Sequence, residues 1–258
     1  MITPRRTRLI RVPDLHAFRR AIGRCSDRPD ALVVVPNRAA VRQIERTVAP
    51  SPSGPRFLTR DELYDELHAR LGGPRRLTAL EREAIAQAAA FEAASAVQDL
   101  PVRIRPGLVA EMLKFYDQLR RQSQAVARFG ELIGQAIGND TSVDRGAERM
   151  LRQTRFLARA FAEYEERARV SGAYDEHLLR ARLVEKPLKP APAHIVVTVA
   201  DWIADPDGLF VADFDLLSRM PGVETIDIIA TEATLGSGFH QRLHEWLRAL
   251  EETIGADP

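Results

Sequence analysis

Four polar residues stand just after two predicted strands, where their side chains could bind an anion. Asn37 and Arg38 follow an apolar, β-branched run (ALVVV), and Thr59 and Arg60 follow a shorter run (RFL). Amide, hydroxyl and guanidinium groups are donors suited to phosphate oxygens. Asn37 and Thr59 can equally cap the helices that follow them. The two roles are compatible, because the free N–H groups at a helix start attract anions.

The first predicted strand, 7–12, is not followed by a loop that could hold a triphosphate. Such a loop needs several glycines between strand and helix and then a lysine. Here only Pro13 and Asp14 separate the strand from a predicted helix at 15–22, and the first lysine in the chain is Lys114. The sequence therefore predicts no nucleotide cradle at this position.

A histidine pair near the end of the chain has the spacing of a metal site. His240 and His244 are four residues apart on a predicted last helix, a spacing that can bind zinc. The acidic neighbour Glu245 does not lie between the two histidines, and the sequence suggests no third ligand. A solvated helix face is therefore the preferred interpretation. An apolar stripe predicts that this helix continues to Ile254. The stripe consists of Phe239, Leu243, Trp246, Leu247, Leu250 and Ile254.

Other reactive groups also favour structural roles. Cys25 is the only cysteine, which excludes an internal disulfide or a thiolate cluster. Gly236-Ser237-Gly238 lacks the G-x-S-x-G pattern of a serine nucleophile. Five aspartates miss the calcium-loop spacing, and a polar turn with a helix cap explains them: Asp201, Asp205, Asp207, Asp213 and Asp215. No metal or other cofactor is expected.

The elements that must position these residues alternate strand and helix at both ends of the chain. Residues 1–75 contain three strand–helix units, 76–185 read as helix throughout, and strands return at 194–199 and 223–230 within 186–258. Because both ends are α/β, one parallel sheet should collect them around an all-helical insertion. Thr78 and Glu81 form a predicted capping box at the start of this insertion.

Composition describes an ordinary globular chain. The 258 residues are 45% hydrophobic with a formal net charge of +1, which argues against disorder and against a global attraction to nucleic acid. The excess of arginine over lysine is typical of genome bias. No stretch is long and apolar enough for a signal peptide or a membrane helix, so a cytoplasmic protein is expected.

The block 36–48 (PNRAAVRQIERTV) resembles the second conserved motif of UvrD/RecB-type superfamily 1 helicases. Two further stretches follow in the order of that family. Residues 56–63 (RFLTRDEL) resemble its next strand and threonine motif, and 194–217 resemble its Walker B strand with the helix after it. The resemblance implies a RecA-like, P-loop NTPase-like parallel sheet with a large all-helical insertion.

The departures from this family concern its motor. Ala200-Asp201 stand where such helicases carry the Asp-Glu pair for magnesium and water, a degenerate Walker B motif. The γ-phosphate sensor is replaced around Ala230-Thr231-Glu232, and the lysine loop is missing. This combination is similar to the AddB-like subunits of bacterial helicase-nucleases and to their relatives, the PD-(D/E)XK nuclease family proteins. The phrase 171–175 (SGAYD) is also similar to a phrase of that branch.

This resemblance implies a catalytically inactive helicase-like module that positions single-stranded DNA in double-strand break processing, DNA repair and DNA recombination. Asn37, Arg38, Thr59 and Arg60 would be its DNA-binding residues. The chain itself is not expected to be an enzyme, because no lysine has the carboxylate two residues earlier that the nuclease motif requires. The resemblance then implies a helicase or nuclease partner subunit. Alternatively, the nuclease would be a C-terminal domain, and this chain would be an N-terminal fragment of the longer protein.

Two alternatives remain open. The chain could be a protein-interaction scaffold without DNA binding, in which Arg38 and Arg60 are ordinary surface charge. It could also be an active ATP-dependent helicase or exonuclease subunit, against which the missing lysine argues.

Overall fold

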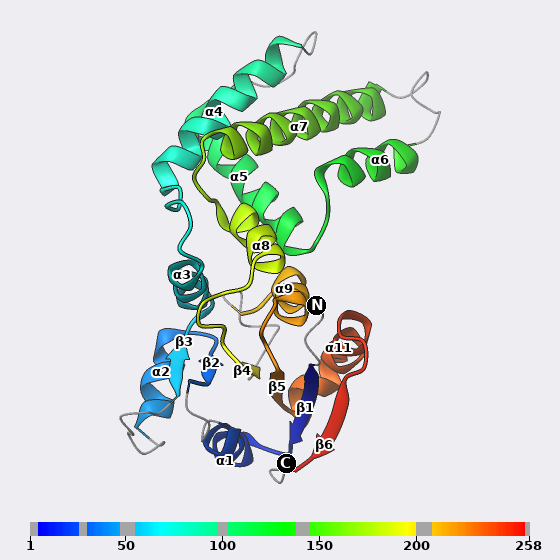
Figure 1. The fold of residues 1–258 in the computed structure, drawn as a ribbon. Helices are drawn as coiled ribbons and strands as arrows, with labels where there is room; N and C mark the ends of the chain where they lie inside the picture. Colours follow the sequence, from blue (N-terminus) through cyan, green and yellow to red (C-terminus); the bar gives the residue numbers. More distant parts are fainter. Residues whose placement is uncertain are drawn as a thin grey trace. The chain divides into compact units, whose positions relative to one another are not determined.

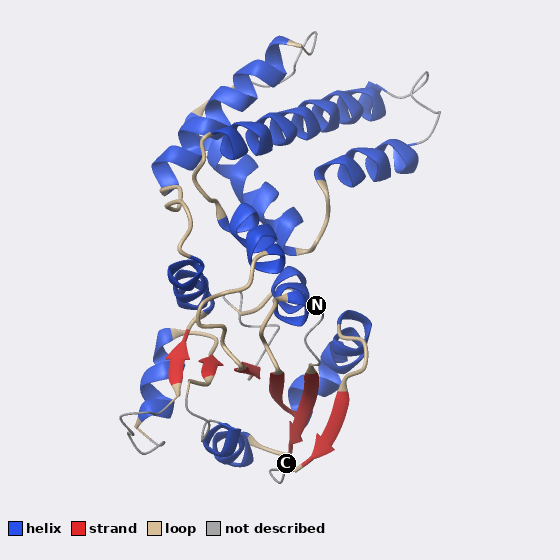
Figure 2. Ribbon diagram, in the orientation of Figure 1, coloured by secondary structure: helices blue, strands red, loops and turns tan. Residues whose placement is uncertain are grey.

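The computed structural model describes residues 5–25, 30–46, 55–96, 103–137, 145–199 and 208–255. The chain divides into two compact units. One unit comprises Met1–Gly73 with Arg180–Pro258, and the other comprises Pro74–Leu179. Sequence patterning placed the corresponding boundaries after residues 75 and 185. The first unit contains all the described strands, whereas the described part of the second is built on helices (Figure 2).

The described strands of the α/β unit form one six-stranded sheet in the order β3-β2-β4-β5-β1-β6 (Figure 1). Every pairing is parallel, which confirms the predicted α/β class and parallel sheet. The strands are β1 (Arg6–Val12), β2 (Leu32–Val34), β3 (Arg56–Leu58), β4 (His194–Val199), β5 (Thr225–Thr231) and β6 (Glu251–Ile254).

Helices cover both faces of this sheet. Helices α1 (Leu15–Cys25) and α2 (Arg38–Glu45) share one apolar cluster with strand residues such as Ile10, Val33 and Ile229. The chain moves one way along the sheet from β1 to β3 and the opposite way from β3 to β6. Because parallel crossovers are right-handed, the later helices must lie on the other face. Figure 1 accordingly shows α3 (Arg60–Leu71) and α9 (Val211–Arg219) on the side of the sheet away from α1.

The end of the chain corrects one sequence-based prediction. The last helix was expected to run to Ile254, but α11 (His240–Trp246) is short and β6 follows it. β6 pairs in parallel with β1, with Leu9 opposite Glu252. The prediction was wrong because the open edge of β1 offers unpaired N–H and C=O groups. Backbone pairing with that edge outweighs the helical spacing of Leu250 and Ile254.

The helical unit is held by an apolar core of small and aromatic side chains. Its helices are α4 (Ala79–Ser95), α5 (Pro106–Arg121), α6 (Val126–Ile137) and α7 (Arg145–Val170). The predicted capping box is present, with Glu81 accepting from the Thr78 N–H at 2.8 Å. Alanines of α4 let this helix approach α7 closely, and Tyr116 and Phe161 fill the space beside them.

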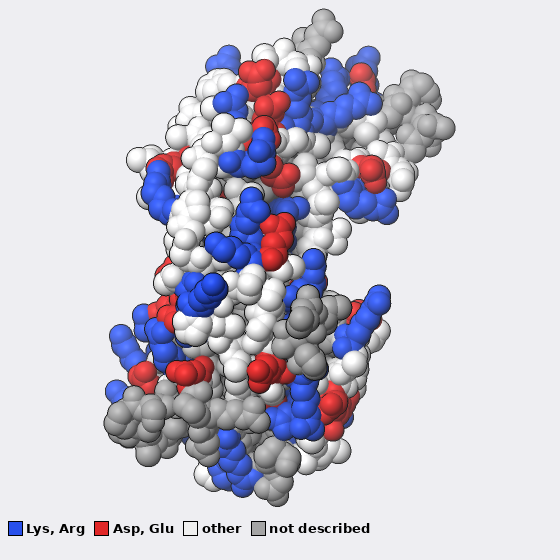
Figure 3. Space-filling view, in the orientation of Figure 1, with Lys and Arg blue, Asp and Glu red and all other residues white. Residues whose placement is uncertain are grey.

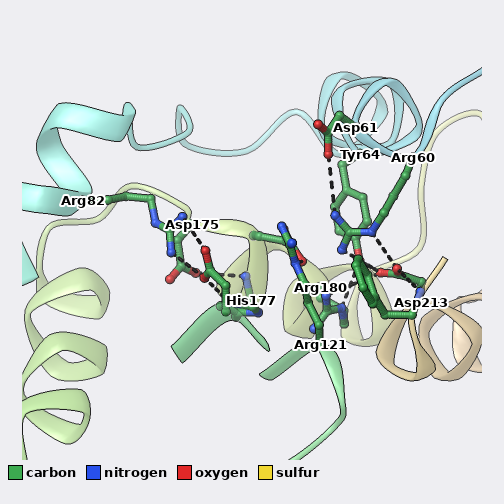
Figure 4. Close-up of polar contacts among 12 residues, drawn as sticks. Arg60, Asp61, Tyr64, Arg82, Arg121, Asp175, His177, Arg180 and Asp213 are labelled. Carbon is green, nitrogen blue, oxygen red and sulfur yellow. Dashed lines mark hydrogen bonds and ion pairs between the residues drawn. The ribbon is translucent and has the colours of Figure 1, made fainter. Parts of the chain in front are cut away.

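A polar network links the ends of these helices. Arg82 donates to Asp117 (2.6 and 3.1 Å) and to the Tyr164 hydroxyl (3.0 Å), and His177 also contacts Asp117 at 2.9 Å (Figure 4). Burial opposes ionisation of Asp117, but its hydrogen bonds from His177 and Arg82 outweigh burial and lower its pKa. Asp175 caps the helix that follows, accepting from the His177 N–H at 3.0 Å. The SGAYD phrase therefore carries a helix cap.

The three central strands of the sheet share a buried ion cluster. Arg8 on β1 donates two hydrogen bonds to Asp227 on β5 (2.6 and 2.8 Å), and His194 on β4 contacts the same carboxylate at 2.8 Å. All three residues are less than a tenth exposed. Burial opposes ionisation of Asp227, but the hydrogen bonds from His194 and Arg8 hold its pKa at about 2. An ionised, fully paired carboxylate thus lies inside the sheet.

We predict that Asp227→Asn lowers the free energy of unfolding by about 3–5 kcal/mol at neutral pH, because the buried Arg8 loses its counter-charge. Folding lowers the pKa of Asp227 from its ordinary value near 4. The stabilisation is therefore complete above that value and is lost as the pH falls through about 2. The difference in free energy of unfolding between the parent and Asp227→Asn should therefore decrease as the pH falls from about 4 to about 2.

Guanidinium unfolding followed by tryptophan fluorescence measures this effect, since Trp246 at the end of α11 belongs to the α/β unit. Glu251→Gln is the matched control, because Glu251 pairs with Arg6 at the exposed edge. This control should change the free energy of unfolding by less than about 1 kcal/mol. Equal losses in the two variants would contradict the assignment.

Candidate nucleic-acid interface

Asn37 stands where β2 turns into α2. After β2 the chain passes Pro36, and the Asn37 side-chain oxygen accepts a hydrogen bond from the Ala40 N–H at 3.0 Å. Val41 and Ile44 fix the helix to the sheet by burying its inner face. Asn37 and Arg38 remain exposed at its start. The structure thus gives Asn37 the capping role and leaves the first turn of α2 open to solvent.

Thr59 occupies the equivalent position on the neighbouring strand. The Val35 N–H donates to the Leu58 carbonyl at 2.8 Å, so the ends of β2 and β3 are held side by side. Thr59 precedes α3, and its N–H donates to the Glu62 carboxylate at 2.9 Å. Two helix starts therefore lie next to each other at the carboxyl edge of the sheet.

An ion pair connects these two helix starts. The guanidinium of Arg38 contacts the carboxylate of Glu62, with side chains 68% and 20% exposed. An exposed pair of this kind contributes only about 0–1 kcal/mol, so a phosphate can compete for Arg38. Sequence reasoning missed Glu62, although its place three residues after Thr59 is the signal of a capping box. Its carboxylate offsets part of the positive charge here.

Arg60 lies elsewhere, inside the protein. Its guanidinium donates to Asp213 on α9 (2.7 and 3.1 Å) and lies 4.9 Å from the ring centres of Tyr64 and Phe210 (Figure 4). The side chains of Arg180 and Tyr64 also contact the Asp213 carboxylate. Arg60 is only 4% exposed, so the surface contact with phosphate predicted for it is not available in this structure. The buried carboxylate draws it inward.

The other predicted residues are placed as follows. Ala200 and Asp201, the degenerate Walker B pair, lie outside the described residues, as do Asp205 and Asp207. Asp215 pairs with Arg219 at 3.0 Å along α9. The two described members of the acidic set, Asp213 and Asp215, are therefore both engaged in ion pairs.

The first strand–helix junction carries its own anion. The connection between β1 and α1 consists of Pro13 and Asp14. One carboxylate oxygen of Asp14 accepts the N–H groups of His16 (2.8 Å) and Ala17 (2.7 Å). These backbone hydrogen bonds, that from Ala17 first, lower the pKa of Asp14. A negative side chain thus occupies the position at the helix start that a bound phosphate would otherwise take.

The sheet order gives Asn37 a further distinction. The chain leaves β2 toward β3 and leaves the adjacent β4 toward β5, in opposite directions. Such a reversal opens a crevice at the carboxyl ends of the strands, where ligands of open α/β sheets bind. The two strands are joined there by a hydrogen bond of 2.9 Å from the Thr198 hydroxyl to the Val34 carbonyl. Asn37 follows β2 on this side.

Charge on the surface is mixed. Figure 3 shows basic and acidic side chains intermixed among the described residues of the visible face. Attraction of an anion must therefore come from local groups, such as a helix start and Arg38, rather than from the charge of the whole chain.

Comparison with known proteins gives no relative from which a function could be transferred. No protein-family model matches the chain, and no protein of curated function matches its sequence. Among the described helices, none combines the length and the apolar character needed to cross a membrane.

We predict that Asp213→Asn lowers the free energy of unfolding by about 3–5 kcal/mol, because Arg60 would stay buried without its counter-charge. Asp215→Asn removes an exposed pair on the same helix and should cost less than about 1 kcal/mol. Guanidinium unfolding with tryptophan fluorescence compares the two variants. If Arg60 were instead a surface residue, Asp213→Asn would lower the free energy of unfolding as little as Asp215→Asn does.

Proposed function

We propose that this chain is a catalytically inactive helicase-like module that positions single-stranded DNA in the processing of double-strand breaks, during DNA repair and recombination. The observation that carries the proposal is the pair of adjacent helix starts at the carboxyl edge of the sheet, with Asn37 and Arg38 exposed on the first of them. The resemblance of the block 36–48 to a helicase motif supports the same residues.

The physical basis is the binding of phosphate at helix N-termini. The start of a helix has N–H groups without a partner inside the helix and carries about half a positive charge. Asn37 accepts one of these groups in α2, and Thr59 with Glu62 forms a capping box at the start of α3. Parallel strands lie about 4.8 Å apart, so the helices after β2 and β3 start close together. Neighbouring phosphates of one extended strand are a suitable ligand for such a pair of starts, and Arg38 adds an exposed cation.

The sheet itself supports a RecA-like module. β1 lies between β5 and β6, and segments from both ends of the chain combine around the helical insertion. Under this proposal the junction after β1 is the lost nucleotide site. Asp14 fills its helix start with a carboxylate, and a triphosphate there would meet a like charge. Motor activity would then come from a helicase partner subunit, and nuclease activity from a nuclease partner subunit.

The Arg38–Glu62 pair favours one rival function, a protein-interaction scaffold without DNA affinity. In that case Glu62 neutralises Arg38 permanently and Asn37 is only a helix cap. DNA binding by the parent protein separates the two proposals.

For DNA binding we predict that the parent binds an oligo(dT) strand with a strong salt dependence and that Arg38→Ala weakens this binding severalfold. The logarithmic salt slope should fall by about 0.7 if one phosphate contact is lost. Asn37→Asp should weaken binding further, since aspartate caps a helix as well as asparagine but repels phosphate. Fluorescence anisotropy at several salt concentrations measures both effects.

Arg19→Ala is the matched control, because Arg19 is an exposed arginine on α1, a helix that follows neither β2 nor β3. It should leave affinity and slope within twofold of the parent. Arg60 is avoided, because its substitution would disturb the buried pair with Asp213. The proposal is wrong if the parent does not bind, or if Arg38→Ala and Asn37→Asp both bind with the parent's affinity and slope.

For nucleotides we predict no shift of the thermal midpoint in millimolar ATP with magnesium. A ligand at 100 times its dissociation constant would stabilise the folded state by about 2.7 kcal/mol, which a thermal melt detects. A clear rise of the midpoint would instead support the active ATP-dependent helicase or exonuclease subunit. Asp14→Asn, which removes the carboxylate charge, tests whether Asp14 alone blocks a weak site.

A further inference from the structure

Three potential metal ligands converge at the end of the α/β unit. The Nε2 atoms of His240 and His244 lie 2.7 and 2.6 Å from the same carboxylate oxygen, Oε1 of Glu252. All three ligand atoms lie within 4.8 Å of one another. Two imidazoles and one carboxylate are the protein ligands of one common class of three-ligand zinc site.

Local structure brings these side chains together from two elements. A π-helical turn, Leu235–Phe239, precedes α11, and Gly238 within it adopts a φ of 90° that favours glycine. α11 then starts at His240, and its helical spacing places His244 on the same face. Glu252 comes from β6, held beside β1 opposite Leu9. Because sequence patterning continued the helix through this region, the third ligand was not foreseen.

Neighbouring charges favour a cation here. Arg11 donates to the second carboxylate oxygen of Glu252 at 3.0 Å and makes a two-point pair with Glu232 (3.0 and 2.8 Å). With neutral histidines, the two carboxylates and the one guanidinium leave a net charge of −1. Arg11 also fixes the orientation of the Glu252 carboxylate. Residues that form hydrogen bonds to metal ligands commonly orient them in this way.

We propose that His240, His244 and Glu252 form a binding site for a divalent transition metal, of which zinc fits the ligand set best. Magnesium and calcium prefer sites made of oxygen ligands alone. In a tetrahedral zinc site the ligand atoms lie about 3.3 Å apart. Glu252 Oε1 therefore needs to withdraw from the rings by less than about 1 Å, with each imidazole proton on Nδ1. The two Nε2 atoms, which lie within 4.8 Å of each other, need to adjust to the same spacing.

The site is open to solvent on one side. The three side chains are 39%, 41% and 27% exposed, in the order His240, His244 and Glu252, so water can supply the fourth ligand. A bound ion would join α11 to β6, the strand at the edge of the sheet. Because the metal binds only when the site is folded, metal binding should stabilise this edge of the sheet.

Zinc binding to the untagged, chelator-treated full chain tests the proposal. Isothermal titration should give one zinc per chain, zinc should raise the thermal midpoint while magnesium does not, and cobalt(II) should give the intense visible absorption of a four-coordinate ion. His240→Ala, His244→Ala and Glu252→Gln should each weaken zinc binding by at least about tenfold. Acidification should also weaken it, because protons compete for the imidazoles.

Two matched controls use exposed residues of the same types. His16→Ala and Glu251→Gln should bind zinc with the parent's affinity. Circular dichroism verifies the fold of each variant, and the parent's cobalt spectrum provides a measurement that needs no variant. The proposal is overturned if the parent takes up no stoichiometric zinc. It is also overturned if the three ligand variants bind as tightly as the parent, or if His16→Ala loses binding as they do.

Discussion

The sheet depends on one carboxylate that two other strands must satisfy. Asp227 on β5 receives hydrogen bonds from Arg8 on β1 and from His194 on β4, and these strands come from opposite ends of the chain. Arg8 or His194 alone would leave the buried carboxylate poorly compensated. The Asp227 carboxylate is therefore fully hydrogen-bonded only when β1, β4 and β5 have all assembled. These strands come from the segments before and after the helical insertion. The entropic cost of this closure grows only slowly with loop length, so the length of the helical insertion adds little to it.

The two ends of the strands then differ in character. The buried cluster lies toward the amino ends, where Arg8 and His194 are near the starts of their strands. The carboxyl ends carry the helix caps Asn37 and Thr59, of which Asn37 is exposed and Thr59 is half-buried. A rigid, paired interior at one end lets the other present several helix starts in a fixed arrangement. The proposed DNA contact depends on this arrangement more than on the charge of any single side chain.

Sequence reasoning predicted the parallel sheet and many of its helices, because apolar runs and helix caps are local signals. It failed where distant residues decide. Nothing in the order of residues joins Arg60 to Asp213, which lie 153 positions apart, so Arg60 was assigned to the surface. Leu250 and Ile254 continued a helical stripe, but the free edge of β1 drew this segment into β6. Glu252 was hidden by the same error, and the histidine pair then lacked its third partner.

The short connection between β1 and α1 limits how this protein could be engineered to bind a nucleotide. Pro13 and Asp14 leave no length of backbone that could wrap around a phosphate chain, and the helix start is already occupied by a side chain of the protein itself. Replacing single residues here changes charge but not loop length. A glycine-rich phosphate loop at this junction would need additional residues inserted between Val12 and Leu15.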